Sequence, residues 1–362
     1  MFIKLTGFRQ INKTQYLYIN SVNNAKMDLN VKDRKILAEL DLNARATFQE
    51  IGKKVRLSKE TTIYRIKNLE GKGIIQRYTT LVNFSKLGYT GYGVFSRFQN
   101  VNETLKKEII EYLSKIPELY WVALIGGKYD VVFGIMAKNV FQFNKIYYKI
   151  LNKYGSHLVD NTIIIRTELR QSKRNYLVNK KPELFKPPHF GKEPEIVKLD
   201  ELNANILSIL SNHARMNVVD IAKMLDKPAS TIASRIKQMV KNKIIEGFTT
   251  YIKSQSYDMQ SYRLLINLQN MDEKARNSLF SYVNTNPNMI LGIETVGKWN
   301  FEITLEVESH EQLQEEISKL RSDFSNIIRN IDFLIMFEDD LVYDPYPLKK
   351  LERNENFQPK YL

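Results

Sequence analysis

Apolar residues recur at helical spacing in the first strongly patterned part of the chain. In the stretch VKDRKILAEL, the apolar positions Val31, Ile36, Leu37 and Leu40 follow the period of an α-helix. Thr47 and Glu50 have the spacing of a capping box, which marks the start of a second short helix. The pattern therefore predicts two short helices in succession.

A third helix is expected over about residues 58–71. Ile63, Ile66 and Leu69 recur on the side that should face a core, whereas the opposite side is polar and basic. Short helices joined by tight turns, with a polar outer face on the last one, form the helix-turn-helix pattern. The segment IIQRYTT that follows is strand-like. This part of the chain therefore predicts a helix-turn-helix of the winged type.

Residues 88–168 have a different pattern. The segments YGVFSRF, YWVALIG, YDVVFGI and NTIIIRTEL are rich in the aromatic and β-branched residues of strands. Two helical stripes separate them, NETLKKEIIEYLSKI with Asn102 as its expected N-cap, and FQFNKIYYKILNKY. The resulting order, βαββαβ, is that of the ferredoxin-like motif.

Both patterns occur twice. SKETTIYRIKNLEGKGII and PASTIASRIKQMVKNKII keep T-x-x-x-R-I-K followed by I-I, and they lie 170 positions apart. The same shift superposes Ala44-Arg45 on Ala214-Arg215, Thr79-Thr80 on Thr249-Thr250, and Gly127-Lys128 on Gly297-Lys298. A constant offset over so long a stretch predicts the duplication of one large unit, not a solenoid of small repeats.

The predicted fold class is therefore α+β, with two repeats, each a winged-type helix-turn-helix domain followed by a ferredoxin-like βαββαβ domain. The expected segments are an N-terminal extension 1–27, helix-turn-helix 28–83, ferredoxin-like domain 84–169, Pro/Lys-rich linker 170–197, helix-turn-helix 198–253, ferredoxin-like domain 254–342 and C-terminal tail 343–362. Two alternatives stay open for the extension: the segment QYLYI adds a strand, or translation starts at Met27.

Charge changes the picture more than composition does. The chain has 54 Lys and Arg against 40 Asp and Glu, a formal net charge of +14. A basic surface attracts polyanions, chiefly nucleic acid or anionic membrane, although a generally basic proteome gives the same excess. No apolar run reaches the roughly 18 residues of a membrane-spanning helix, and no signal peptide is evident. We therefore expect a cytoplasmic protein that does not engage a membrane.

Catalytic signatures do not emerge from the sequence. It has no cysteine, which excludes disulfides and thiolate metal sites, and it has no P-loop, G-x-S-x-G or H-E-x-x-H motif. The four histidines are not at metal-ligand spacing. The expectation is a protein that is not an enzyme and needs no metal or cofactor.

With these motifs in view, the chain resembles the Lrp/AsnC family of transcriptional regulators. The resemblance is carried by ATFQEIGKKVRLSKETTIYRIKNLEGKGIIQRY and the turn GGKYD in the first unit, and by DIAKMLDKPASTIASRIKQMVKNKIIEGF and GKWN in the second. It implies an N-terminal DNA-binding domain and a C-terminal domain that dimerises and binds small effectors. Because two units share one chain, we expect them to pair as an intrachain pseudo-dimer, with a higher homo-oligomer as a further option.

The resemblance implies double-stranded DNA as partner and the third helix of each unit as the DNA-reading element. Arg65 and Arg235 occupy matching positions there, and an arginine can pair with guanine or clamp a phosphate. The further candidates are Ser58, Lys59, Thr61, Thr62 and Tyr64 in the first unit and Ser230, Thr231 and Ser234 in the second. A solvated helix face, or packing and capping roles for the threonines, is the alternative for each.

The second unit departs from the family pattern. Asn203 stands where the first unit has Asp33, Pro228 stands where it has Ser58, and Asn300 replaces Asp130. The second unit therefore resembles a diverged partner with weaker or different DNA contacts.

The glycine turns are the expected effector region. The resemblance places an effector, often an amino acid, near Gly127, Lys128, Tyr129 and Asp130 and near Gly297, Lys298, Trp299 and Asn300. The alternative is that the glycines only supply the positive φ that a tight hairpin needs. Two other functions stay open: a sirohaem-decarboxylase-like enzyme on the same fold, and a co-assembly partner that does not bind DNA. The function expected from the sequence is a nucleoid-associated transcriptional regulator.

Overall fold

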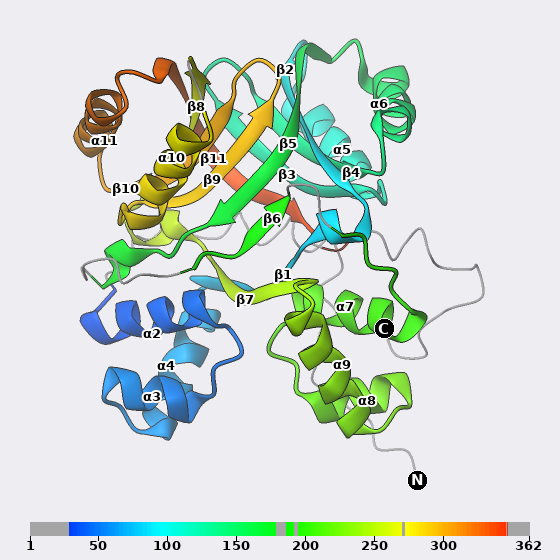
Figure 1. The fold of residues 1–362 in the computed structure, drawn as a ribbon, viewed down its shortest axis with the longest axis vertical. Helices are drawn as coiled ribbons and strands as arrows, with labels where there is room; N and C mark the ends of the chain where they lie inside the picture. Colours follow the sequence, from blue (N-terminus) through cyan, green and yellow to red (C-terminus); the bar gives the residue numbers. More distant parts are fainter. Residues whose placement is uncertain (1–28, 179–185, 192–194, 270–271, 345, 347–362) are drawn as a thin grey trace.

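A computed structural model of the chain describes residues 29–178, 186–191, 195–269, 272–344 and 346. The expected N-terminal extension and nearly all of the expected C-terminal tail lie outside these residues. Over the described part of the chain, two small helical modules lie side by side beneath one large sheet assembly (Figure 1). No described helix is long and apolar enough to cross a membrane.

The first module consists of α2 (Val31–Leu42), α3 (Phe48–Val55) and α4 (Lys59–Gly71). The predicted capping box is present, because the Glu50 N–H donates to Thr47 Oγ1 over 3.2 Å and the Thr47 N–H donates to Glu50 Oε2 over 2.7 Å. These reciprocal bonds satisfy two donors that the end of a helix leaves unpaired. The core of the module includes Ile36, Leu37, Leu40, Ile51, Val55, Ile66 and Leu69.

The second module repeats this arrangement with α7 (Glu201–Asn212), α8 (Val218–Leu225) and α9 (Ala229–Lys241). Asn217 caps α8 by accepting the Asp220 N–H over 2.8 Å. Pro228 occupies the N-cap position of α9 and makes no side-chain capping bond. The predicted duplication of the helix-turn-helix is confirmed, and its second copy has the weaker helix start.

A two-stranded ribbon joins the modules. Strand β1 (Ile75–Val82) of the first unit pairs antiparallel with β7 (Ile245–Ile252) of the second. Thr79 lies opposite Thr249, and these two residues are equivalent positions of the repeat. An approximate two-fold axis therefore passes between them. The two strands form one shared wing, so neither module has a wing of its own.

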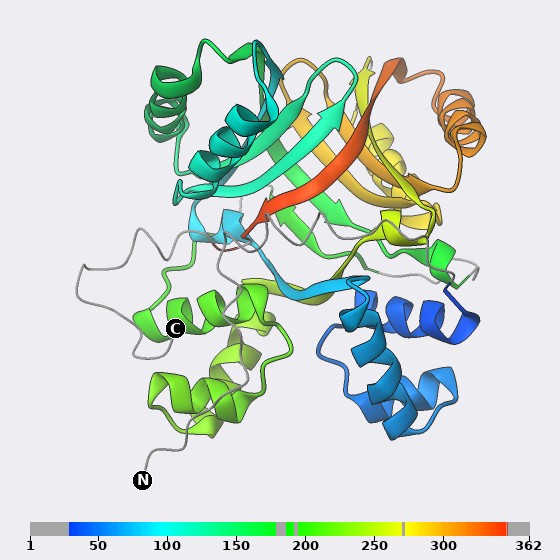
Figure 2. The same ribbon diagram turned by 180° about the vertical axis from the view of Figure 1, so that it is seen from behind.

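The large sheet contains the remaining described strands, in the order β2-β4-β3-β11-β8-β10-β9-β5-β6. Their bounds are β2 Thr90–Phe98, β3 Leu119–Gly126, β4 Val131–Ala137, β5 Leu158–Gln171, β6 His189–Gly191, β8 Gln260–Leu268, β9 Met289–Val296, β10 Phe301–Val307 and β11 Ile328–Tyr343. Outer helices cover it on two sides: α5 (Glu103–Ser114) and α6 (Val140–Tyr154) in one unit, α10 (Glu273–Thr285) and α11 (His310–Asp323) in the other (Figures 1 and 2).

Two long strands join the ferredoxin-like halves. The first part of β5 pairs with β2 of its own unit and the later part pairs with β9 of the other. Strand β11 likewise pairs first with β8 and then with β3. The pairing is continuous around a ring, so each half covers edge strands that would otherwise offer unpaired N–H and C=O groups. The two units thus form a pseudo-dimer within one chain.

Part of the linker is built into this assembly. Strand β6 pairs with β5, and residues Asn175–Leu177 form a short 3-10 turn. The buried Glu168 carboxylate of β5 meets the linker's His189 at 3.0 Å, Arg170 at 2.6 Å and Arg276 of α10 at 2.5 Å. The expected semi-extended spacer is therefore docked at this end, where charge-assisted bonds hold it against the second unit.

Glu168 should make stability depend on pH. Burial raises its pKa, but bonds from His189 and Arg170 outweigh burial and hold the pKa at about 2, against an ordinary 4.5. A depressed folded-state pKa stabilises the protein above pH 4.5, and that contribution is lost as the pH falls toward 2. We expect Glu168→Gln to lower the free energy of unfolding by about 2–4 kcal/mol at pH 7.

Urea denaturation at pH 7, 4.5 and 3.5 measures this effect, and the deficit of the variant should shrink at each step down. The matched control is Glu103→Gln on α5, since Glu103 is exposed and forms a surface ion pair with Lys106. That change should shift the free energy of unfolding by less than about 0.5 kcal/mol. A Glu168→Gln deficit that does not vary with pH would contradict the assignment.

Candidate nucleic-acid interface

The outer face of α4 is exposed and largely polar. Lys59, Glu60, Lys67 and Asn68 are exposed there, and Tyr64 is 72% exposed. A tyrosine there can offer both its ring and its hydroxyl group to a partner. On α9, the equivalent outer face carries the exposed Ser230, Ser234, Lys237, Gln238 and Lys241.

The start of α4 uses its hydroxyl groups for structure. Ser58 is the N-cap and its Oγ accepts the Thr61 N–H over 3.1 Å. Thr62 is fully buried and its Oγ1 donates to the Ser58 carbonyl over 2.8 Å. Thr62 was predicted to face DNA, and that prediction is wrong, because its side chain fills the space beside Gly52. Ile63, predicted as core, is only half-buried.

Thr231 of α9 is half-buried, as Thr61 is. The position equivalent to Thr62 is Ile232, which is fully buried. An isoleucine at this position in the other copy signals an inward-facing residue. Comparing the two copies position by position could have identified Thr62 as core from the sequence.

The two predicted DNA-contacting arginines are already bonded within their modules. Arg65 Nη1 lies 2.9 Å from Asp33 Oδ1 and 3.4 Å from Asn30 Oδ1. Arg235 Nη1 pairs with Asp200 Oδ2. Arg65 therefore joins α4 to the start of α2, and Arg235 joins α9 to the start of α7; we refer to α4 and α9 as the recognition helices. Both guanidinium groups remain partly exposed.

The aspartate that pairs with the arginine lies at a different position of the repeat in each copy. In the first module Asn30 is the N-cap of α2 and Asp33 lies one turn later. In the second, Asp200 is the N-cap of α7 and Asn203 lies one turn later. Burial raises the pKa of Asp200, but bonds from the Asn203 N–H and Arg235 lower it overall. The departure of Asn203 from the family pattern is thus compensated by Asp200.

Sequence reasoning missed the lysines that follow these arginines. Lys67 and Lys237 are equivalent and exposed, and they complete the repeated T-x-x-x-R-I-K motif. Ile66 and Ile236 of the motif are buried. The motif therefore contains one core residue, one arginine that holds the module together, and one exposed lysine on the outer face.

The two modules are joined by hydrogen bonds that an arginine of each unit donates to the other unit. Arg45 Nη1 donates to the carbonyls of Ala214 (2.5 Å) and Met216 (3.0 Å) in the other unit. Arg215 Nη1 donates in return to the carbonyls of Ala44 and Ala46. Each guanidinium also faces an aromatic ring, Phe248 for Arg45 and Phe48 for Arg215. The positions of the two recognition helices are thereby tied together.

Threonines of the ribbon complete the exchange. Thr79 and Thr80 donate their hydroxyls to carbonyls in the last turn of α7, each over 2.7 Å. Thr249 and Thr250 do the same for the last turn of α2, over 2.9 and 3.0 Å. Carbonyls in the last turn of a helix lack partners within the helix, so each unit's ribbon strand caps the other unit's first helix.

Comparison with known proteins identifies this architecture. Residues 29–76 match a family model described as winged helix-turn-helix DNA-binding, and residues 199–240 match the AsnC-type helix-turn-helix domain. An uncharacterised HTH-type transcriptional regulator of Pyrococcus abyssi is 34% identical over 116 residues, which cover 32% of this chain and 77% of that protein. An HTH-type transcriptional regulator of Methanocaldococcus jannaschii is 33% identical over 142 residues, covering 37% and 90%.

The chain belongs to the Lrp/AsnC family of transcriptional regulators. Its tandem architecture has a counterpart among solved structures: the siroheme decarboxylase NirDL covers 90% of this chain and 100% of its own, with a TM-score of 0.54 and 11% identity. At that identity the likeness concerns the fold alone. The relatives above are named as transcriptional regulators, which supports a regulator over an enzyme.

The structure brings the two predicted effector turns together. Lys298 Nζ lies 3.4 Å from the Tyr129 hydroxyl, and Trp299 and Tyr129 both contact Phe95. Tyr129 and Trp299 are buried, whereas Gly127, Lys128, Gly297 and Lys298 are exposed. Gly127 and Gly297 have φ of 115° and 151°, the region that favours glycine.

Asp130 and Asn300 accept equivalent hydrogen bonds from the backbone. Asp130 Oδ2 accepts the Phe98 N–H over 2.8 Å, and Asn300 Oδ1 accepts the Leu268 N–H over 2.9 Å. Because an amide oxygen accepts this bond as a carboxylate does, the change from Asp to Asn preserves the bond to the neighbouring strand. Their side chains are engaged at the ends of β2 and β8.

The different position of this aspartate in the two modules can be tested by substitution. Asp33→Asn should remove the carboxylate that pairs with Arg65 and loosen α4 by roughly 1 kcal/mol, the usual size for a partly exposed pair. Adding Asn30→Asp rebuilds the arrangement of the second module and should restore most of the loss. Native-state hydrogen exchange of the α2 and α4 amides measures it, with the second module as internal control. If the α2 and α4 amides of the double variant were no better protected from hydrogen exchange than those of Asp33→Asn, an aspartate at position 30 would not replace Asp33 as the partner of Arg65.

Proposed function

We propose that this protein is a sequence-specific DNA-binding transcriptional regulator in which α4 and α9 read two half-sites. The observation that carries the proposal is that Arg45 and Arg215 each donate hydrogen bonds to the other unit's backbone. These bonds hold the two helix-turn-helix modules side by side, below the sheet assembly in Figure 2. A homodimeric regulator obtains this spacing from two chains, and here one chain supplies both modules. The half-sites should lie about one DNA turn apart, roughly 34 Å, or a multiple of it.

The proposed DNA contacts follow exposure. Tyr64, Lys59 and Lys67 extend from α4, and Lys237 and Ser234 extend from α9. Ser58, Thr61, Ser230 and Thr231 lie at the helix starts, where free backbone N–H groups also favour a phosphate. Arg65 and Arg235 contact DNA with the donors that Asp33 and Asp200 do not use. Thr62 is left out because it is buried.

We further propose effector control at the converging glycine turns. The support is the family resemblance, together with the exposed Lys128 and with Lys298, which lies beside the Tyr129 hydroxyl. An ammonium and a hydroxyl can both donate to a carboxylate, which fits an amino acid. The protein would act as a pseudo-dimeric chain at the nucleoid in the cytoplasm, and sedimentation at several protein concentrations tests for a higher homo-oligomer.

Two alternatives lead to different results. A sirohaem-decarboxylase-like enzyme would change the visible spectrum of an added haem precursor. A co-assembly partner without DNA contacts would give no salt-dependent shift of random DNA. The exposed basic faces of both α4 and α9 favour DNA binding over each of these.

The lysines missed by sequence reasoning give a direct test. Lys67→Gln and Lys237→Gln should each weaken DNA binding, and each should lower the slope of log affinity against log salt by about one unit if the lysine contacts phosphate. Fluorescence anisotropy with duplex DNA at several salt concentrations measures the slope. Lys107→Gln on α5, an exposed lysine of the sheet assembly, is the control and should leave the slope unchanged. Unchanged slopes for both recognition-helix variants would refute the proposed contacts.

Differences between the two faces predict an asymmetric target. The exposed Tyr64 of the first module is Ser234 in the second, and Lys59 corresponds to Ala229. The first half-site should therefore carry more base-specific information, with about 1–3 kcal/mol lost per mismatch and less in the second half-site. Selection from random DNA measures both halves. A palindromic consensus with equal losses on either side would show that two chains place identical α4 helices on DNA.

A further inference from the structure

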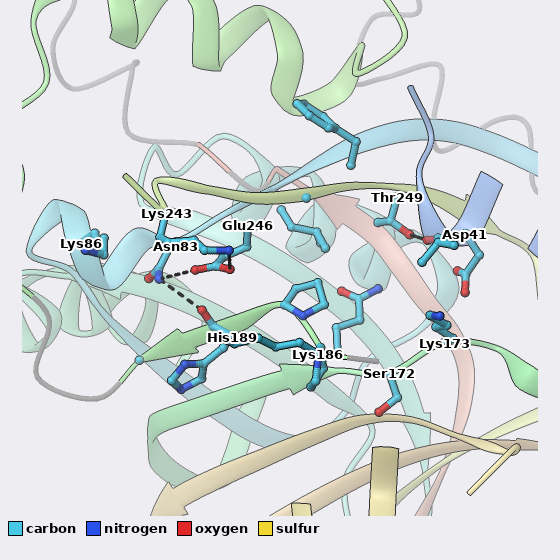
Figure 3. Close-up of a pocket in the computed structure, with 18 residues that line it drawn as sticks. Asp41, Asn83, Lys86, Ser172, Lys173, Lys186, His189, Lys243, Glu246 and Thr249 are labelled. Carbon is cyan, nitrogen blue, oxygen red and sulfur yellow. Dashed lines mark hydrogen bonds and ion pairs between the residues drawn. The ribbon is translucent and has the colours of Figure 1, made fainter. Parts of the chain in front are cut away.

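A cavity of about 470 Å³ lies between the ribbon that joins the modules and the docked part of the linker (Figure 3). Its walls come from three parts of the chain that are distant in sequence. Asp41 and Leu42 come from the end of α2, Leu81 and Phe248 come from the ribbon, and Pro187-Pro188 comes from the linker. This cavity is separate from the outer faces of α4 and α9 and from the glycine turns.

The duplication explains why there is room for this cavity. In the repeat, Gly247 of β7 is equivalent to Arg77 of β1, and Leu81 is equivalent to Tyr251. Arg77 is 9% exposed and its guanidinium lies 4.3 Å from the centre of the Tyr251 ring, so large side chains fill the ribbon at that end. At the opposite end, a Cβ on Gly247 would meet only Leu81 at 3.6 Å and Pro188 at 3.8 Å. The missing side chain leaves the space open.

The cavity has more cations than available carboxylates. Lys86, Lys173, Lys186 and Lys243 line it. Of the two carboxylates in its lining, Asp41 is bonded to Arg174 at 2.7 Å and Glu246 lies 3.5 Å from Lys243. Within the described residues, Lys86 and Lys186 have no carboxylate partner. The lining thus offers positive charge beside the apolar surfaces of Leu81 and Phe248.

A buried polar atom in the lining also lacks a partner. Asn83 is 5% exposed, and its Nδ2 donates to the His189 carbonyl over 3.2 Å and lies 3.5 Å from Glu246 (Figure 3). Its Oδ1 has no hydrogen-bond partner in the described part of the chain. A buried acceptor left unpaired destabilises the fold, and a hydroxyl donor from a ligand would relieve that cost.

We propose that this cavity binds a small organic anion that combines a carboxylate, a compact apolar body and a hydroxyl group. The lysines attract the carboxylate, Leu81 and Phe248 cover the apolar body, and Asn83 accepts the hydroxyl. A bound anion touches the end of α2, the ribbon and the linker together, so its binding alters how the modules are held. This last step, control of DNA affinity, rests on the proposed DNA-binding function, whereas binding itself does not.

Isothermal titration of the full chain with 4-hydroxybenzoate, in the absence of DNA, tests the site. We expect saturable one-to-one binding, at least fivefold weaker binding of benzoate, which lacks the hydroxyl, and no binding of phenol, which lacks the carboxylate. Lys86→Gln with Lys186→Gln should weaken binding at least tenfold, and Lys107→Gln should not change it. Gly247→Leu should abolish binding by filling the cavity, and the lysine variants test the site independently if that variant does not fold.

The second arm measures DNA affinity with and without saturating 4-hydroxybenzoate. We expect a change of at least threefold that the Lys86→Gln, Lys186→Gln variant does not show. Absence of saturable binding, or wild-type binding by the lysine variant, overturns the site even when DNA binds normally. Binding of the anion with no effect on DNA affinity overturns the control step alone, and loss of DNA binding under all conditions overturns the proposed function instead.

Discussion

Antiparallel pairing of β1 with β7 is the constraint on which the rest of the molecule depends. The pairing places Thr79 opposite Thr249, so the approximate two-fold axis of the duplicated chain passes through the ribbon. Around that axis, threonine hydroxyls cap the opposite unit's first helix and Arg45 and Arg215 exchange bonds. Breaking the ribbon would leave these helix carbonyls and guanidinium groups unpaired together, which makes the joint cooperative.

The sheet assembly obeys the same symmetry in its strands but not in its side chains. Strands β5 and β11 cross between the halves in equivalent ways. At the centre, however, Arg263 bonds Glu302 at 2.8 Å and Arg166 bonds the Tyr120 hydroxyl at 2.6 Å, with both guanidinium groups near the Trp121 ring. Buried charges of this kind need specific partners, so each half supplies different members of one network.

Covalent duplication explains this divergence. In a homodimer every substitution appears on both sides of the axis, whereas here each copy can change alone. The acid that holds the recognition-helix arginine moved from Asp33 to Asp200, and the large side chain of Arg77 has no counterpart at Gly247. The linker adds a further asymmetric contact, because Arg174 joins Asp41 of the first module to Glu306 of the second unit's sheet.

The local features and the repeat could be predicted from the order of residues alone. Helix spacing, the Thr47–Glu50 capping box, the βαββαβ order and the 170-residue offset depend on neighbours in the chain, and the structure confirms them. The folded molecule was needed to show that Arg65 is held by Asp33 and that each ribbon strand pairs with the other unit. These outcomes depend on which groups meet across space, and an arginine on an outer helix face has the same sequence pattern whether it meets water, a carboxylate or DNA.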